Sequence, residues 1–226
     1  MKRSCIVFIL AVLAMTPGNA RPTDGVEVSL SSGYVIPSSP MAFANYWKMQ
    51  YGGTVAAGIS LSESITLIGA FEYYRFKLDE DGLNEAFNTG YMRDIWIFQD
   101  VSMAPSADPS TITTVSANVR VSPLGLSGVL SPYVTGGAGV MFFSQSEITL
   151  PTTSILVING APVAMTAQQT VIGGAQTAVM FQLGVGCDVR IAESFEMFIE
   201  ARYTSGLTEG LGTMYVPLTA GVRLHL

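Results

Sequence analysis

The last eleven residues of the chain alternate strictly between apolar side chains and polar or small ones. The apolar positions are Val216, Leu218, Ala220, Val222, Leu224 and Leu226, and between them lie Pro217, Thr219, Gly221, Arg223 and His225. Because successive side chains of a strand point to opposite faces, this pattern predicts a strand with one apolar and one polar face. What the chain can fold into depends on what the apolar face contacts.

The N-terminal segment, residues 1–20, has the pattern of a secretory signal peptide. Lys2 and Arg3 precede an apolar run at 5–15, and small residues follow up to Ala20. The run is too short to span a bilayer, which argues against the alternative of a membrane anchor. We therefore expect cleavage near Ala20, which leaves residues 21–226 as one exported domain.

Charge and cysteine content exclude several classes of function. The chain has 11 basic and 17 acidic residues, and removal of Lys2 and Arg3 with the signal leaves 9 and 17, a net charge of −8. This acidity argues against a nucleic-acid partner. Of the two cysteines only Cys187 remains after cleavage, so we expect no internal disulfide and no cysteine metal site.

Hydropathy narrows the architecture further. Charged residues make up only 12% of the chain, and the mean hydropathy of +0.41 is high for a soluble protein. After residue 20, however, no apolar stretch approaches the ~20 residues that a membrane helix needs. A closed β-barrel reconciles these observations, because it spreads its lipid contact over alternate residues.

Alternation with a period of two recurs along the chain, and the segments are joined alternately by short turns and longer connections. The segments are 26–36, 51–61, 65–77, 113–121, 132–142, 179–191, 195–204 and 216–226. They predict an all-β fold, an eight-stranded antiparallel up-and-down transmembrane β-barrel with short periplasmic turns and long extracellular loops. Pro37 is expected to end the first strand. The third strand is apolar on both faces, and we orient it by Glu72, which costs less inside the barrel than in lipid.

Sorting the charged residues by strand phase places most of them on the inner face. This predicted barrel-interior charge network consists of Glu27, Glu72, Arg120, Asp188, Arg190, Glu196, Glu200, Arg202 and Arg223. An eight-stranded barrel is only wide enough for side chains to fill it, so these charges must pair with each other or with trapped water. We expect a plug of ion pairs and not an open pore.

Aromatic residues gather near the predicted outer ends of the strands. They are Tyr34, Tyr46, Trp47, Tyr51, Tyr73, Tyr74, Phe142, Phe143, Tyr203 and Tyr215. An aromatic girdle at the membrane interface is the expectation for such positions. The alternative is ordinary packing of aromatic side chains under surface loops.

The whole pattern resembles the small outer-membrane β-barrel proteins of Gram-negative bacteria that look like the transmembrane domain of OmpA. Thr219, Gly221, Leu224 and Leu226 fit the C-terminal polar-x-Gly-x-x-apolar-x-apolar assembly signal of that family, although its last residue is usually aromatic. A weaker resemblance, to the Pro-Tyr-x-x-Gly-x-Gly start of a middle strand common in the family, is carried by Pro132, Tyr133, Gly136, Gly137 and Gly139.

The resemblance implies location and partners. It places the chain in the outer membrane as a monomer, in contact with outer-membrane lipid and lipopolysaccharide. During export its partners would be periplasmic chaperones and the barrel assembly machinery. The resemblance implies neither a cofactor nor a nucleic-acid partner.

The residues with ionisable side chains are better explained by structural roles than by catalysis. The single histidine, His225, lies at the predicted periplasmic end, and Glu196 and Glu200 lie beside arginines, which favours salt-bridged packing over a raised pKa. The acidic residues at 79–81 suit a divalent cation, but such runs are more often simply solvated. We therefore predict no catalytic residues, no metal ligands, no cofactor and no redox role for Cys187.

The longer connections are where activity is expected to lie. Within 144–174, Asn159 and Gly160 separate two apolar runs, 155–158 and 161–165, which is a strong hairpin signal. This hairpin either projects as a paired arm or extends the wall to ten strands, and we prefer the arm because each run is too short to cross a bilayer. The segment 83–96 is compatible with a short helix or a partner-binding surface.

Three functional hypotheses remain open. The first is an outer-membrane barrel without catalytic activity that supports the envelope or makes surface contacts through its loops. The second is a narrow pore or small-molecule carrier. The third is a secreted, soluble, lipocalin-like barrel that binds an apolar ligand, which requires the reverse polarity with charges facing water.

Overall fold

The computed structural model describes residues 25–226 except 63, 91–97, 124–129, 159–160 and 209–211. The expected signal peptide and its cleavage site lie outside the described residues, as do Asn159, Gly160 and Trp96. None of the helices in the described part of the chain is long and apolar enough to cross a membrane.

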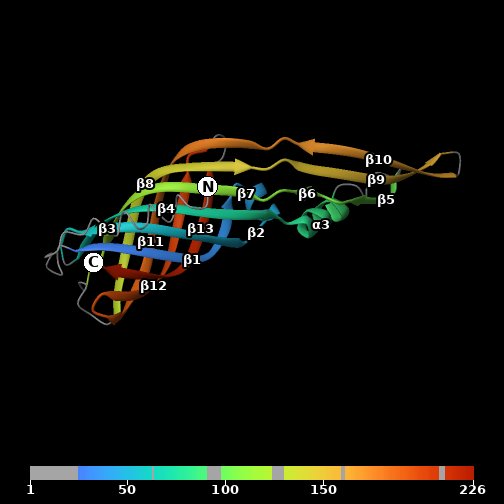
Figure 1. Ribbon diagram of the computed structural model, residues 1–226. Coiled ribbons are helices and arrows are strands. Elements are labelled where there is room, and N and C mark those ends of the chain that lie inside the picture. Colours follow the sequence, from blue (N-terminus) through green and yellow to red (C-terminus); the bar gives the residue numbers. More distant parts are fainter. Residues whose placement is uncertain (1–24, 63, 91–97, 124–129, 159–160, 209–211) are drawn as a thin grey trace, which may run out of the picture.

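Eight long antiparallel strands pair into a closed ring, and Figure 1 shows this barrel from the side. Each strand pairs with its neighbours along the sequence, β1 also pairs with β13, and the pairing of β4 with β7 completes the circuit. The strands are β1 (Val26–Ser39), β3 (Gln50–Ser60), β4 (Ile65–Leu78), β7 (Ser110–Val121), β8 (Leu130–Gln145), β11 (Gly174–Ala192), β12 (Phe195–Gly206) and β13 (Thr213–His225). The predicted eight-stranded up-and-down barrel is confirmed.

The two ends of the barrel differ sharply. At one end, called here the turn rim, the strands are joined by 61–64, 122–129 and 193–194. The opposite end, the loop rim, carries all the added elements. These are α2 (Met41–Tyr46), β2 (Trp47–Lys48), α3 (Glu80–Gly90), β5 (Phe98–Met103), β6 (Ser106–Ala107), β9 (Ile148–Ile158) and β10 (Ala161–Val171).

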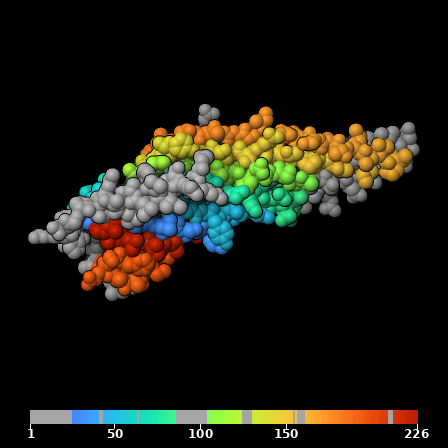
Figure 2. Space-filling view, in the orientation of Figure 1, coloured from blue at the N-terminus to red at the C-terminus, as the bar shows by residue number. Residues whose placement is uncertain are grey.

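The hairpin β9–β10, called here the arm, lies outside the ring. Its strands pair with each other over eleven residues and belong to a separate four-stranded sheet with β5 and β6. Figures 1 and 2 show the arm extending as a narrow projection from the loop rim. The expectation of a projecting arm is confirmed and the ten-stranded wall is wrong. The paired runs are also longer than predicted, because Thr and Gln residues continue the pairing beyond the apolar positions.

Two further expectations need correction. The first strand does not end at Pro37, since Pro37 pairs with Tyr215 and the strand continues to Ser39 after a register shift. Proline is tolerated at such irregularities because the missing N–H interrupts only one position of the ladder. The helix expected from residue 83 begins earlier, at Glu80.

Strand phase agrees with the orientation chosen from the charges. On β4, Glu72 is fully buried, whereas Leu67 and Phe71 are 45% and 50% exposed. Glycines that face the lumen leave room for large side chains, because a Cβ on Gly184 would overlap Arg202 and a Cβ on Gly186 would overlap Tyr133. The barrel is therefore inverted relative to a soluble protein, with polar side chains inside and apolar ones outside.

Candidate functional surfaces: wall, lumen and loop rim

The outer wall of the ring is apolar. Side chains that are 37–68% exposed come from every strand and include Leu30, Val55, Ile59, Leu67, Phe71, Val115, Val119, Val134, Val140, Phe181, Leu183, Val185, Met197, Ile199 and Leu218. On the described ring strands, the only charged side chains on the exposed face are Arg75 and Lys77, both at the loop end of β4. A contiguous apolar surface of this extent is unfavourable in water and favourable against acyl chains.

Charged side chains fill the turn-rim half of the lumen. The Arg120 Nη2 atom lies 2.6 Å from Glu27 Oε2, and Arg223 Nη1 lies 2.5 Å from Asp188 Oδ1. The Nε atom of Arg223 also lies 3.4 Å from Glu27 Oε1, which links the two pairs. All four side chains are at most 3% exposed. These pairs join β1, β7, β11 and β13 across the barrel.

Glu196 belongs to the same cluster of ion pairs and lies closer to the turn rim. Its carboxylate lies 3.4 Å from Arg190 Nη2, 3.5 Å from Arg223 Nη1 and 3.1 Å from His225 Nε2. His225 is thus held by a carboxylate at the turn rim. The Arg223 guanidinium in addition lies 4.9 Å from the centre of the Phe198 ring, a cation–π distance.

A second cluster lies deeper in the barrel. Arg202 forms ion pairs with Glu72 and with Glu200, whose Oε1 lies 2.7 Å from Arg202 Nε. The Tyr74 hydroxyl donates to Glu72 Oε2 at 3.0 Å. The structure thus places all nine residues of the sequence-derived interior network inside the barrel, where each takes part in an ion pair.

A small cavity separates the two clusters. Its volume is about 40 Å³, and its lining includes Ser31, Thr54, Asn118, Glu200 and Arg202. This volume has room for only a few water molecules. Side chains of both clusters, Arg202 and Arg223 among them, line this cavity.

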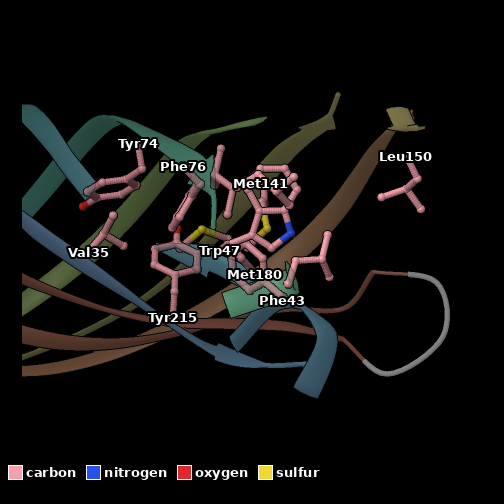
Figure 3. Packing of buried hydrophobic residues seen from close by; sticks show 12 residues of the cluster. Val35, Phe43, Trp47, Tyr74, Phe76, Met141, Leu150, Met180 and Tyr215 are labelled. Carbon is pink, nitrogen blue, oxygen red and sulfur yellow. The ribbon is translucent and has the colours of Figure 1, made fainter. Parts of the chain in front are cut away.

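A cluster of buried apolar side chains, called here the apolar plug, lies at the loop-rim end of the barrel (Figure 3). Phe76 packs edge-to-face against Phe43 with ring centres 5.0 Å apart, and Tyr74 packs similarly against Tyr215 at 5.5 Å. The plug consists of Val35, Phe43, Trp47, Tyr74, Phe76, Leu78, Leu83, Ile112, Met141, Leu150, Met180 and Tyr215. It is built partly from strands and partly from α2, α3 and the base of the arm.

Part of the predicted aromatic girdle is wrong, because several of its residues belong to the plug. Tyr74 and Tyr215 are fully buried in the lumen and Trp47 is 6% exposed, while Tyr46 and Phe143 pack against the plug. Strand phase could have predicted the burial of two of them. Tyr74 lies on the same strand face as Glu72, and Tyr215 lies on the same face as Arg223. The remaining aromatic residues of the expected girdle do face outward, at 43–62% exposure: Tyr34, Tyr51, Tyr73, Phe142 and Tyr203.

The acidic residues at 79–81 connect β2 and the start of α3 at the loop rim. Lys48 Nζ lies 3.0 Å from Asp79 Oδ1 and 3.2 Å from Asp81 Oδ2, and the Gly82 N–H donates to Asp79 Oδ1 at the start of α3. The Gly82 hydrogen bond, followed by the Lys48 contact, lowers the pKa of Asp79. Hydrogen bonds to Asp79 and Asp81 raise the pKa of Lys48. Asp79 thus caps the N-terminus of α3, and Asp79 and Asp81 both form salt bridges with Lys48.

An antiparallel eight-stranded ring with an apolar wall and an ionic lumen is the fold of the small bacterial outer-membrane β-barrels. The chain is similar to Neisserial surface protein A, with 12% identity over 88% of this chain and 96% of that one and a TM-score of 0.49. It is also similar to the N-terminal β-barrel domain of Pseudomonas aeruginosa OprF, with 16% identity, coverages of 88% and 97% and a TM-score of 0.43.

A third similar structure is Ail, the attachment invasion locus protein of Yersinia pestis, with 13% identity, coverages of 89% and 97% and a TM-score of 0.37. No protein-family model matches the sequence, and no curated protein sequence matches it. At these identities the likeness concerns the fold alone.

Proposed function

We propose that the protein is an integral outer-membrane barrel without catalytic activity that makes surface contacts through the arm. The inverted polarity carries the membrane assignment: Leu183 is 68% exposed on the wall, whereas Glu72 is fully buried in the lumen. This polarity is opposite to that of a soluble lipocalin-like barrel. The long loops of such barrels face outside, so the loop rim and the arm lie at the cell surface.

The contents of the lumen favour a scaffold over the pore or carrier hypothesis. Two ion-paired clusters and an apolar plug fill it in series, and the cavity between the clusters measures only about 40 Å³. Opening a path would require breaking buried ion pairs, which costs several kcal/mol for each pair. We therefore expect no conductance when the purified protein is reconstituted in a planar bilayer, and steady single-channel currents would overturn this part of the proposal.

The edge of the arm supports the surface-contact role. Along β10, Val163 and Met165 are 42% and 53% exposed, and the strand contains no charged residue. Within the described residues β10 pairs only with β9, so its outer edge presents unpaired backbone groups. Exposed strand edges without charges readily add another strand.

Membrane insertion is tested by fractionation together with gel mobility. A folded barrel is expected to remain with outer membranes after sarkosyl extraction and to migrate differently before and after boiling. A soluble protein without a mobility shift would end the membrane assignment. The assembly role proposed for Thr219, Gly221, Leu224 and Leu226 is tested in the same way, since Leu224→Asp should reduce the amount of folded barrel.

The contact role is tested with cells that display the protein. Val163→Lys with Met165→Lys places two charges on the exposed strand and leaves the ring untouched, so the mobility shift should persist. Adhesion of cells to one another and to an apolar surface should fall. Leu207→Lys, at another exposed loop-rim position, serves as the control. Unchanged adhesion of the arm variant would overturn the contact role.

A further inference from the structure

The backbone of the arm determines which groups its free edge offers. The Ala104 N–H donates to the Pro151 carbonyl at 3.2 Å, so the backbone groups of Pro151 point toward β5 and β6 and away from β10. Pro151 lies opposite Gln168 in an unshifted antiparallel ladder, and the two residues of such a pair direct their backbone groups away from each other. Gln168 and every second residue of β10 therefore point their backbone groups outward from the free edge.

The outward positions of β10 are Pro162, Ala164, Thr166, Gln168 and Thr170. All of them offer a carbonyl to a partner, and all except Pro162 offer an N–H as well. The proline lies at a position where its missing N–H leaves the pairing with β9 intact. Every side chain of β10 is exposed. Within the described residues the strand thus lacks both a neighbour on its edge and a cover on its faces.

Charge favours a partner that resembles the arm itself. Residues 148–171 contain no charged side chain, although the whole chain carries a formal net charge of −6. A charged strand laid against this edge would lose hydration and gain no counter-ion. An uncharged strand loses little, and the arm of a second copy of this chain is such a strand.

The side chains of β10 complement those of an identical antiparallel strand. One strand face carries Ala161, Val163, Met165, Ala167, Gln169 and Val171, of which only Gln169 is polar. With Thr166 on a two-fold axis, Met165 lies opposite Ala167 of the second copy, so the apolar face continues from one strand to the other. This register joins the two edges by about eight backbone hydrogen bonds. That number is within the range of specific protein–protein interfaces.

The direction of the arm determines where the second copy lies. Strand β10 runs from the outer end of the arm back toward the barrel, and the arm projects from the loop rim (Figure 1). In an antiparallel pair the outer end of each arm lies beside the base of the other, so the two barrels lie at opposite ends. The rims are then separated by the length of the strand, which is several times the screening length of about 8 Å. The acidic rims therefore repel each other only weakly.

We propose that β10 pairs antiparallel with β10 of a second copy in a facing membrane, with the two Thr166 residues on the two-fold axis. The strand order β5, β9, β10 then continues in reverse through the second copy as one sheet. This inference rests on the proposed contact role of the arm and names its partner. A single contact of this size is weak, and many copies on two facing membranes act together.

Disulfide trapping tests the partner and the register together. The folded protein with Cys187→Ser, which removes the free cysteine of the described chain, is reconstituted at one barrel per lipid nanodisc. Thr166→Cys should yield a crosslinked dimer on mild oxidation, because the Cα atoms of a hydrogen-bonded pair lie about 5.5 Å apart, within the range for a disulfide. Thr170→Cys is the matched control on the same strand face, since it would lie about 26 Å from its counterpart. Equal crosslinking of the two variants, or none at residue 166, would overturn the proposal.

Sedimentation of the same nanodiscs measures the strength of the association. Thr166→Pro removes the two N–H donors at the axis and leaves the pairing with β9 intact. It should raise the dissociation constant of paired discs about 30-fold, because each lost hydrogen bond contributes a factor of about five. Thr166→Val keeps the N–H and should change the constant less than about threefold. Equal weakening by the two variants would overturn pairing through the backbone edge.

Cell adhesion separates this inference from the proposed function. Cells that display the protein should clump with one another and should not bind cells that lack it. Equal binding to cells without the protein, combined with a loss of adhesion in the Val163→Lys and Met165→Lys variant, would refute only the second copy as the partner. Unchanged adhesion of that variant would refute the contact role and the pairing that depends on it. A gel mobility shift in each variant shows that its ring is folded.

Discussion

Replacing Glu27 by glutamine is expected to lower the free energy of unfolding by about 3–5 kcal/mol, the range for a buried ion pair that loses one partner. Glu27 is 2% exposed and accepts contacts from Arg120 at 2.6 Å and from Arg223 at 3.4 Å. After the change, Arg120 loses its ion-pair partner at 2.6 Å, while the Thr66 hydroxyl at 3.2 Å and the Tyr133 ring at 5.6 Å remain. Arg223 retains Asp188, so most of the cost falls on Arg120.

A double-mutant cycle isolates the interaction of this pair. Arg120→Met removes the cation and keeps much of the side-chain volume, and Glu27 then still has Arg223 at 3.4 Å. We expect a cost of about 3 kcal/mol for this single variant. The double variant buries neither member of the pair as an unpaired charge, so it should cost about 2 kcal/mol less than the sum of the two single variants.

The measurement is urea unfolding in lipid vesicles, followed by tryptophan fluorescence and by gel mobility. Trp47 is buried in the plug and therefore contributes a signal for the folded lumen. Glu193→Gln, at the exposed turn between β11 and β12, serves as a control and should stay within about 0.5 kcal/mol of the wild type. If Glu27→Gln lowers the free energy of unfolding by less than about 0.5 kcal/mol, or if the effects of the two single variants simply add in the double variant, the charges are hydrated and the lumen is not closed.

Three further outcomes are expected. Leu183→Arg should cost about 2–4 kcal/mol in vesicles because it places a cation in hydrocarbon, whereas Leu207→Arg at the loop rim should cost much less; similar costs would contradict the lipid-facing wall. Because the folded-state pKa of Asp79 is lowered, its contribution is present above the ordinary aspartate pKa and is lost as pH falls through the lower value. The protection of the α3 amides against exchange, relative to the intrinsic rate at each pH, should therefore fall in acid, and an equal fall in Asp79→Asn would argue against this assignment. Deleting residues 152–169 should leave the stability of the ring within about 1 kcal/mol of the wild type, since Leu150 stays in the plug; loss of the mobility shift would contradict an independent arm.

Strand phase made most of the ring predictable. Side chains of a strand alternate between faces, so a single charged residue such as Glu72 was sufficient to orient a strand with two apolar faces. The same rule placed Arg202 and Asp188 inside. The identity of each ion pair was beyond the sequence, because Glu27 and Arg120 are 93 positions apart and meet only when the ring closes.

The apolar plug was missed for two different reasons. Tyr74 and Tyr215 were assigned to the girdle by their height on the strands, although their phase pointed inward. Trp47 and Phe43 lie in a connection without periodicity, and only packing shows that they fold back into the barrel mouth. The arm was recognised from its turn residues, but its length depended on pairing of Thr and Gln residues that carry no hydrophobic signal.

The length of the arm determines what an approaching surface meets first. A strand of eleven residues reaches about 36 Å at 3.3 Å per residue. A coat of surface sugars shallower than this would hide the barrel mouth but not the outer part of β10. Shortening the arm in steps would then change the depth at which contacts form, independently of how tightly they form.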